Sequence, residues 1–287
     1  MSVLRGALEN DRATLLCFLA RIQLPVRLKF SVTNSIFLGL KATHFSTLTC
    51  RTTYLVKMAD SNPSVVHPPY SEIIVVRHGE TLWNVDGRLQ GHLDVELNEV
   101  GRQQAALVAD RLSKEPKISA IYSSDLKRAS ETAEIIAARC GGLEVIEDEN
   151  LRERHLGDLQ GLVLHEAAKV SPEAYQAFLS RQTAQHIPGG GESLDQLYQR
   201  CTSCLQKIAK KHKGERVVVV THGGVIRALY RRACPNKKPP GKVLNTSINI
   251  FIIPDGNKWT AKTWGDVSHL NQTQFLESGF GGDRTSG

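Results

Sequence analysis

Polar side chains suited to phosphate chemistry occur in four short segments of the sequence. The first, Arg77-His78-Gly79, directly follows the apolar run Ile73-Ile74-Val75-Val76. Such a run of β-branched residues predicts a buried strand, and open α/β sheets bind ligands at the carboxyl ends of their strands. Arg128, Glu153 and His222 each follow or end another predicted strand. We therefore expect these groups to meet at one edge of a sheet.

A single histidine at a strand end is more often an ordinary polar residue than a catalytic one. The prediction of a catalytic site therefore depends on four motifs taken together. Arg77-His78-Gly79-Glu80-Thr81, the segment 123–129 around Arg128, Leu151-Arg152-Glu153 and Thr221-His222-Gly223-Gly224 occur in that order. Together they resemble the histidine phosphatase superfamily, that is, the phosphoglycerate mutase-like group and in particular its plant members. Each motif alone is a weak signal, whereas four in order are strong.

This resemblance, which runs from about residue 71 to about residue 266, implies phosphoryl transfer through a phosphohistidine. His78 would attack phosphorus and hold the phosphoryl group covalently, which divides one difficult displacement into two. Arg77, Arg128 and His222 would stabilise the charge on the transferred group. Glu153 would protonate the leaving oxygen and later deprotonate water. The resemblance implies no metal and no cofactor, because these cationic groups replace a metal ion.

Further residues match positions that lie near the phosphate in the family. The predicted substrate-binding residues are Asn84, Gln90, Gly91 and Gly223. His155 matches a neighbour of the catalytic acid that either binds substrate or packs, so it stays outside the catalytic set. His92 is interpreted as a structural residue.

The leading functional prediction is a metal-independent phosphatase acting in carbohydrate metabolism on a small phosphorylated metabolite of the phosphoserine, phosphoglycerate or sugar-phosphate class. The stretch 154–188 is short and Pro-Gly-Gly-Gly-Glu-Ser follows it, as in the phosphatase branch of the family. Gln160 stands where many of these phosphatases have an acidic residue, which leaves the substrate class open. The first alternative is a cofactor-dependent phosphoglycerate mutase, which in the family carries a longer insertion. The second is a catalytically silent binding module, which should have lost a core group.

Strands alternate with helices along the chain and end in a hairpin, which predicts an α/β fold: a three-layer α/β/α sandwich with a mostly parallel central sheet. We expect Trp83 to Asp94 to form a loop, Asn98 to cap a helix, and Pro172 to divide a helical cap over the site. The 3.6-residue apolar stripe from Leu194 to Ile208 predicts a helix packed on the sheet. The expected strands are 71–76, 118–122, 144–147, 217–220, 246–253 and 258–264.

Composition limits the partners. The formal charge is +7, but residues 1–57 carry eight Lys or Arg and two acids, so residues 58–287, with 28 basic and 27 acidic side chains, are nearly neutral. That distribution does not support a nucleic-acid surface.

Six cysteines in 287 residues do not indicate a disulfide framework, and Cys201 and Cys204 are interpreted as buried packing residues.

We divide the chain into an N-terminal extension (1–70), a catalytic domain (71–277) and a mobile tail (278–287). The extension is basic and rich in Ser and Thr, which suits a chloroplast or mitochondrial transit peptide. Met58 reads equally well as an alternative start, which would give a cytosolic protein. No uncharged run in residues 1–57 is long enough to span a membrane. The expected partner is a small phosphorylated metabolite, and the oligomeric state stays open, with a homodimer as one option.

Overall fold

A central sheet organises the computed structural model, which describes residues 69–256 and 258–270. Within this part of the chain the strand order is β3-β2-β4-β1-β5-β6. The strands are β1 (Tyr70–Arg77), β2 (Ala120–Ser123), β3 (Val145–Glu147), β4 (Arg216–Thr221), β5 (Ile248–Pro254) and β6 (Thr260–Asp266). The predictions about the transit segment, the Met58 start and the C-terminal tail lie outside the described residues.

The sheet is parallel on one side and antiparallel on the other. Strands β3, β2, β4 and β1 pair in parallel, whereas β5 pairs antiparallel with β1 and β6. Strand β4, with Val217 to Val220 fully buried, lies between β2 and β1, as expected for a strand that is apolar on both faces. In the register Arg77 is opposite Thr221. His78 and His222, the next residues of the two strands, therefore leave the same edge of the sheet.

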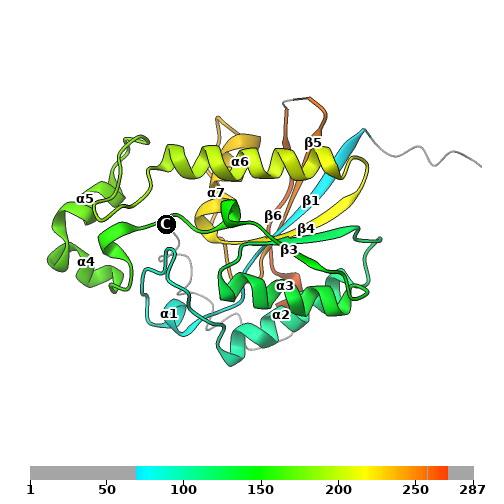
Figure 1. The fold of residues 1–287 in the computed structure, drawn as a ribbon, viewed down its shortest axis with the longest axis horizontal. Helices are drawn as coiled ribbons and strands as arrows, with labels where there is room; N and C mark the ends of the chain where they lie inside the picture. The colour runs from blue at the N-terminus through cyan, green and yellow to red at the C-terminus, as the bar shows by residue number, and fades with distance from the viewer. Residues whose placement is uncertain (1–68, 257, 271–287) are drawn as a thin grey trace, which may run out of the picture. The chain divides into compact units, whose positions relative to one another are not determined.

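Helices cover both faces of the sheet, so the predicted three-layer α/β/α arrangement is confirmed (Figure 1). Helices α6 and α7 lie on one side, and α2 and α3 lie on the other. The helices are α1 (Leu82–Val85), α2 (Glu99–Leu112), α3 (Lys127–Arg139), α4 (Leu164–Val170), α5 (Pro172–Leu179), α6 (Leu194–Lys211) and α7 (Gly223–Ala233).

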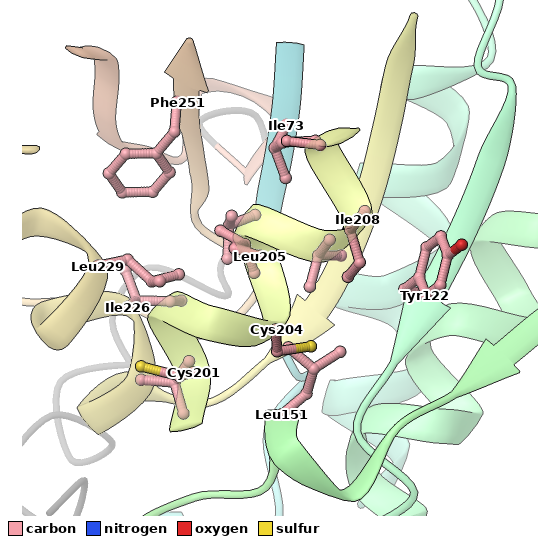
Figure 2. Close-up of a cluster of buried hydrophobic side chains, with 14 of the residues drawn as sticks. Ile73, Tyr122, Leu151, Cys201, Cys204, Leu205, Ile208, Ile226, Leu229 and Phe251 are labelled. Atoms are coloured by element: carbon pink, nitrogen blue, oxygen red, sulfur yellow. The ribbon is translucent and has the colours of Figure 1, made fainter. Parts of the chain in front are cut away.

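The α6 side of the sheet holds the largest cluster of buried apolar side chains (Figure 2). Leu205, Ile208 and Cys201 project from α6 toward Ile73 of β1 and the helix α7. Burying a side chain such as Leu205, which is 0% exposed, contributes about 1.5–3 kcal/mol. Cys201 and Cys204 are buried free thiols, so their interpretation as packing residues is confirmed.

A smaller cluster attaches the cap helices α4 and α5 to the rest of the domain. Ala167 of α4 and Ala174 and Ala177 of α5 pack with Leu156, Leu159, Leu89 and Ile187. Pro172 is the first residue of α5, which is where proline is tolerated in a helix, so it divides the cap as predicted. The cap thus rests on the segments that directly follow Glu153 and precede α6.

Most predicted element boundaries agree with the structure to within two residues. Asn98 caps α2 by accepting a hydrogen bond from the Gly101 N–H at 2.7 Å. The prediction of a continuous loop over 83–94 was wrong at its start, because Thr81 and Asn84 form a reciprocal cap around the short helix α1. The first strand also begins one residue earlier than predicted, at Tyr70.

Candidate active site

His78 lies at the centre of the candidate site, directly after β1. It is 3% exposed, and its Nδ1 lies 2.7 Å from its neighbour's carbonyl oxygen, Gly79 O. Because a carbonyl only accepts, Nδ1 carries the proton and Nε2 keeps its lone pair. Burial, followed by the charges of Arg128 and Arg77, holds the pKa of His78 well below its ordinary value. The ring is therefore neutral at physiological pH, as a nucleophile requires.

His222 faces His78 from the end of β4. The ring centroids are 5.2 Å apart and the planes are tilted by 53°. His222 Nε2 lies 2.9 Å from Ser124 Oγ, which itself accepts a hydrogen bond from Leu126 N. Ser124 can donate its hydroxyl proton to Nε2, and in that tautomer Nδ1 of His222 is a donor. Burial and then the charge of Arg128 lower the pKa of His222 well below its ordinary value.

Arg128 lies in the first turn of α3 and is 1% exposed. Its Nη1 donates to Leu93 O at 2.9 Å and its Nη2 to Gly91 O at 2.8 Å, so loop carbonyls fix the plane of the guanidinium. Burial lowers the pKa of Arg128 to about 10, and Arg77 adds to the effect, yet the group stays charged at neutral pH. Arg77, equally buried, donates from Nη1 to Val243 O at 2.5 Å.

Glu153 is held by two backbone amides. Its Oε1 accepts from Arg154 N at 2.8 Å and its Oε2 from Gly224 N, in the first turn of α7, at 3.0 Å. Each carboxyl oxygen retains a further lone pair that can take a proton. Gly223, a predicted substrate-binding residue, is the first residue of α7, so Glu153, Gly223 and His222 are neighbours.

The predicted substrate-binding residues that follow β1 are linked either to His78 or to Arg128. Asn84 Oδ1 accepts from Thr81 N at 3.1 Å and from Asn245 Nδ2 at 3.3 Å, while Asn245 Nδ2 also donates to His78 O at 3.0 Å. These contacts orient the amide so that the Nδ2 of Asn84 is its remaining polar atom. Gly91 contributes the carbonyl that anchors Arg128, and Gln90 is buried beside it.

Several polar atoms of this cluster are buried without a hydrogen-bond partner in the part of the chain that the structure describes. They include the donors Asn84 Nδ2 and Arg128 Nε, and His222 Nδ1. Leaving a buried donor unpaired costs about 1–3 kcal/mol, so such groups are explained best by a ligand that accepts from them. Buried N–H donors and charged guanidinium groups around a neutral imidazole can bind an anion and stabilise charge that develops on it.

Close backbone packing fixes the loop that follows His78. A Cβ at Gly79 would lie 2.4 Å from Gly101 O, and one at Gly101 would lie 2.1 Å from Glu80 O. The amides of this loop are also paired, since Gly79 N donates to Thr132 Oγ1 and Glu80 N to Gln104 Oε1, both at 3.0 Å. The loop and the first turn of α2 therefore pack backbone to backbone.

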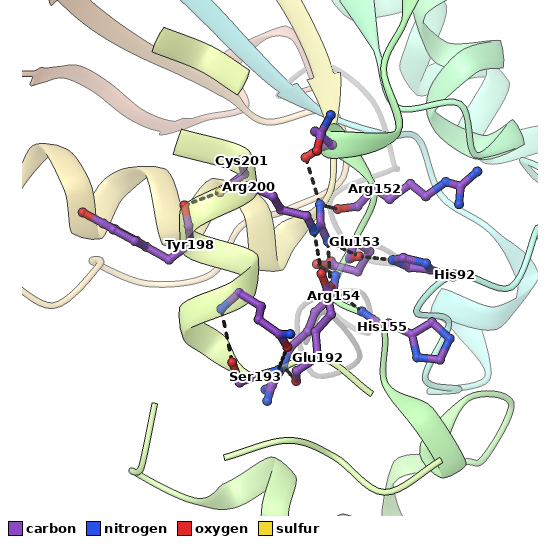
Figure 3. Close-up of polar contacts among 12 residues, drawn as sticks. His92, Arg152, Glu153, Arg154, His155, Glu192, Ser193, Tyr198, Arg200 and Cys201 are labelled. Atoms are coloured by element: carbon purple, nitrogen blue, oxygen red, sulfur yellow. Dashed lines mark hydrogen bonds and ion pairs between the residues drawn. The ribbon is translucent and has the colours of Figure 1, made fainter. Parts of the chain in front are cut away.

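Sequence reasoning missed a polar network around Glu153 (Figure 3). Arg200 and Glu192 form a half-buried ion pair with an Arg200 Nε to Glu192 Oε1 distance of 2.7 Å. His92, predicted to be structural, lies 2.6 Å through Nε2 from the carbonyl oxygen of Glu153 and contacts the His155 ring edge to face. The Pro-Gly-Gly-Gly-Glu-Ser motif that contains Glu192 indicated the phosphatase branch of the family, but it gave no sign of a contact with Glu153.

Gln160, the departure from the phosphatase pattern, supports the same loop region. Its Oε1 accepts from His92 N at 2.7 Å and would lie 2.2 Å from a Cβ added at Gly91. An amide oxygen thus fixes the backbone next to the carbonyl that anchors Arg128. Within the described ranges, no group of three or more metal-ligating side chains is close enough to hold an ion, and no helix is long and apolar enough to cross a membrane.

Comparison with known proteins adds independent information. A sequence profile of the histidine phosphatase superfamily (branch 1) matches residues 73–267. Phosphoglycerate mutase-like protein 4 of Arabidopsis thaliana is 69% identical over 218 residues, which span 76% of this chain and 95% of that protein. The metal-independent phosphoserine phosphatase of the same plant is 54% identical over 218 residues, 76% of this chain and 91% of that protein.

Among solved structures, a phosphoserine phosphatase from Entamoeba histolytica in complex with 3-phosphoglyceric acid is similar to this chain. The TM-score is 0.61 at 30% identity, and the match covers 70% of this chain and 99% of that one. This similarity confirms the predicted fold class.

Proposed function

The chain belongs to the histidine phosphatase superfamily and is a phosphatase of that superfamily, and we propose that it hydrolyses phosphoserine or a closely related small phosphate ester without a metal ion. The phosphoserine phosphatases among its relatives support this choice of substrate class. The observation that carries the proposal is the set of buried, unpaired donors on Asn84, Arg128 and His222 around the neutral ring of His78.

In the first step that we propose, His78 Nε2 attacks phosphorus and the ester oxygen leaves. The proton stays on His78 Nδ1, which donates it in a hydrogen bond to the Gly79 carbonyl, and this bond stabilises the cationic ring that forms. Arg77, Arg128 and the Nδ1–H of His222 bind the equatorial oxygens, where negative charge accumulates in the transition state. Glu153 gives its proton to the leaving oxygen, so the product departs as an alcohol.

In the second step water attacks the phosphohistidine. Glu153, now a carboxylate, removes a proton from that water, the P–N bond breaks, and its electron pair returns to His78 Nε2. Inorganic phosphate leaves, and the enzyme regains its starting protonation state. The two backbone amides that hold Glu153 keep the carboxyl group in one place while it acts first as acid and then as base.

A cofactor-dependent phosphoglycerate mutase is the second candidate, because a 69%-identical relative is named mutase-like. A mutase must exclude water from its phosphoenzyme, whereas here the cap consists of two short helices, Leu164–Val170 and Pro172–Leu179. This small cap favours hydrolysis.

The test is to incubate the full chain, in the presence of EDTA, with phosphoserine, 3-phosphoglycerate and sugar phosphates, and to record both free phosphate and isomerised product. We expect phosphate release from phosphoserine that EDTA does not reduce. Isomerisation of 3-phosphoglycerate without phosphate release, dependent on a bisphosphate primer, would instead establish a mutase.

A further inference from the structure

The segment that carries Glu153 has little regular structure of its own. Only the single 3-10 turn Glu149–Leu151 precedes Glu153, and the backbone then continues as an irregular chain to His155. Without a helix or sheet ladder, the position of such a segment depends on contacts from elsewhere. A general acid must hold its proton within hydrogen-bond distance of one particular oxygen, so these contacts bear directly on its chemistry.

Arg200, on helix α6, supplies three of them (Figure 3). Its Nη1 donates to Asn150 O at 2.9 Å and to Arg152 O at 2.7 Å, and its Nη2 donates to Glu153 O at 2.7 Å. One guanidinium thus binds three carbonyl oxygens of four consecutive residues. The planar, rigid fork of arginine can do this, whereas the single ammonium group of lysine cannot.

Glu192 completes the arrangement from the loop before α6. Its carboxylate binds Arg200 at two points, Nε to Oε1 at 2.7 Å and Nη2 to Oε2 at 2.8 Å. The same Oε2 accepts from His155 N at 2.9 Å, and Glu192 N donates to His155 O at 2.8 Å. Burial opposes the charge on Glu192, but the bonds from Arg200 outweigh it, and the pKa of this carboxyl is lowered.

We propose that Arg200 and Glu192 are positioning residues for the general acid Glu153. They touch no substrate themselves; they fix the backbone on both sides of Glu153, while the amides of Arg154 and Gly224 fix its carboxyl oxygens. The inference rests on the role proposed for Glu153 and extends it to the Pro-Gly-Gly-Gly-Glu-Ser loop.

A misplaced general acid should slow the hydrolysis of esters with a poor leaving group more than that of esters with a good one. Phosphoserine has an alkoxide leaving group that needs a proton, whereas the leaving group of p-nitrophenyl phosphate departs without one. A displacement of about 1 Å can cost on the order of 100-fold in rate. We therefore expect Arg200→Lys to lower kcat for phosphoserine by ten- to a hundred-fold, with KM changed less than about threefold, and kcat for p-nitrophenyl phosphate by less than about threefold.

The matched control is Arg216→Lys. Arg216 is as exposed as Arg200 (19% against 17%) and also combines ion pairs with a backbone carbonyl, Pro116 O. It lies at the start of β4, whereas His222 follows the end of that strand. Arg216→Lys should lower thermal stability about as much as Arg200→Lys. It should not change the ratio of kcat for phosphoserine to kcat for p-nitrophenyl phosphate. Glu192→Gln, which keeps the size of the side chain, should show the Arg200→Lys pattern in weaker form.

A double substitution tests the coupling. In a Glu153→Gln background the acid is absent, so adding Arg200→Lys should lower the phosphoserine rate by less than about twofold. Equal losses on both substrates, a control that behaves like Arg200→Lys, or additive losses in the double variant would each overturn the proposal.

Hydrogen exchange separates this proposal from the proposed function. Arg200→Lys should speed amide exchange in residues 150–155 and leave β1 and β4 unchanged. If the wild-type protein hydrolysed neither ester, the proposed function would fail while faster exchange would still support the positioning role. Unchanged exchange at 150–155 would overturn the positioning role whatever the activity.

Discussion

Gly101→Ala should remove most of the activity while leaving the protein folded. Gly101 lies in the first turn of α2, and a Cβ there would lie 2.1 Å from Glu80 O and 2.7 Å from Glu80 N. Real Cβ atoms essentially never approach closer than 3.0 Å, so the two backbones must separate by about 1 Å. Glu80 lies two residues after His78, and the loop between them moves with it.

The expected magnitudes follow from this geometry. Overpacking of a closely packed interior costs about 1–3 kcal/mol, and the higher helix propensity of Ala returns about 1 kcal/mol. The net destabilisation of about 0–2 kcal/mol corresponds to a fall in Tm of at most about 8 °C for a domain of this size. A nucleophile misplaced by about 1 Å loses on the order of 100-fold in rate.

The assay compares kcat for phosphate release, and Tm, in Gly101→Ala, the wild type and Gly256→Ala. Gly256 is the control because a Cβ there meets nothing within 4 Å and its φ is not positive. We expect a loss of activity in Gly101→Ala alone, with both variants folded at the assay temperature. A Gly101→Ala enzyme with wild-type kcat would refute the claim that this backbone contact positions His78.

Three further outcomes are expected. Glu153→Gln should lower kcat for phosphoserine by about 10²–10⁴-fold and affect p-nitrophenyl phosphate much less, in steady-state assays; equal losses would contradict an acid role. The pKa values of His78 and His222 are lowered in the folded protein, so below the ordinary histidine pKa, 6.5, the unfolded chain binds more protons than the folded one. The contribution of these two histidines to the free energy of unfolding is therefore fully present above that pH and is lost as pH falls. Urea unfolding at successive pH values should show each histidine contributing up to about 1.4 kcal/mol per pH unit, and His78→Gln should reduce that slope; an unchanged slope would show that His78 is not held neutral. Leu205→Ala, which empties a fully buried position on α6, should cost about 2–5 kcal/mol by urea denaturation, and a loss below about 1 kcal/mol would mean that this core adapts.

The parts of the fold that follow from periodicity were predictable. Val217 to Val220, apolar on both faces, indicated a central strand, and β4 lies between two parallel neighbours. Asn98 indicated a helix start because its side chain can replace a missing backbone partner, and it caps α2. The residues of the candidate site were identified by four ordered motifs that resemble the histidine phosphatase superfamily, and two of these residues, His78 and His222, directly follow parallel strands of the sheet.

The supports of the site were not predictable in the same way. Arg200 contacts carbonyl oxygens of residues 47 to 50 positions earlier in the chain, and backbone carbonyls carry no sequence signal. Its position on α6 fits the polar side of an amphipathic helix, so the pattern alone suggests a solvated charge. Gly101 likewise reads as a weak point in a helix, and its close approach to Glu80 depends on the tertiary fold.

The central claim is that His78 carries the phosphoryl group. The most direct test is to mix the enzyme with phosphoserine, quench within milliseconds at alkaline pH, where phosphohistidine survives, and map the modified peptide by mass spectrometry. The account predicts one phosphorylated histidine, at His78, that disappears in His78→Ala. Phosphorylation at another residue, or turnover by His78→Ala at the wild-type rate, would contradict it.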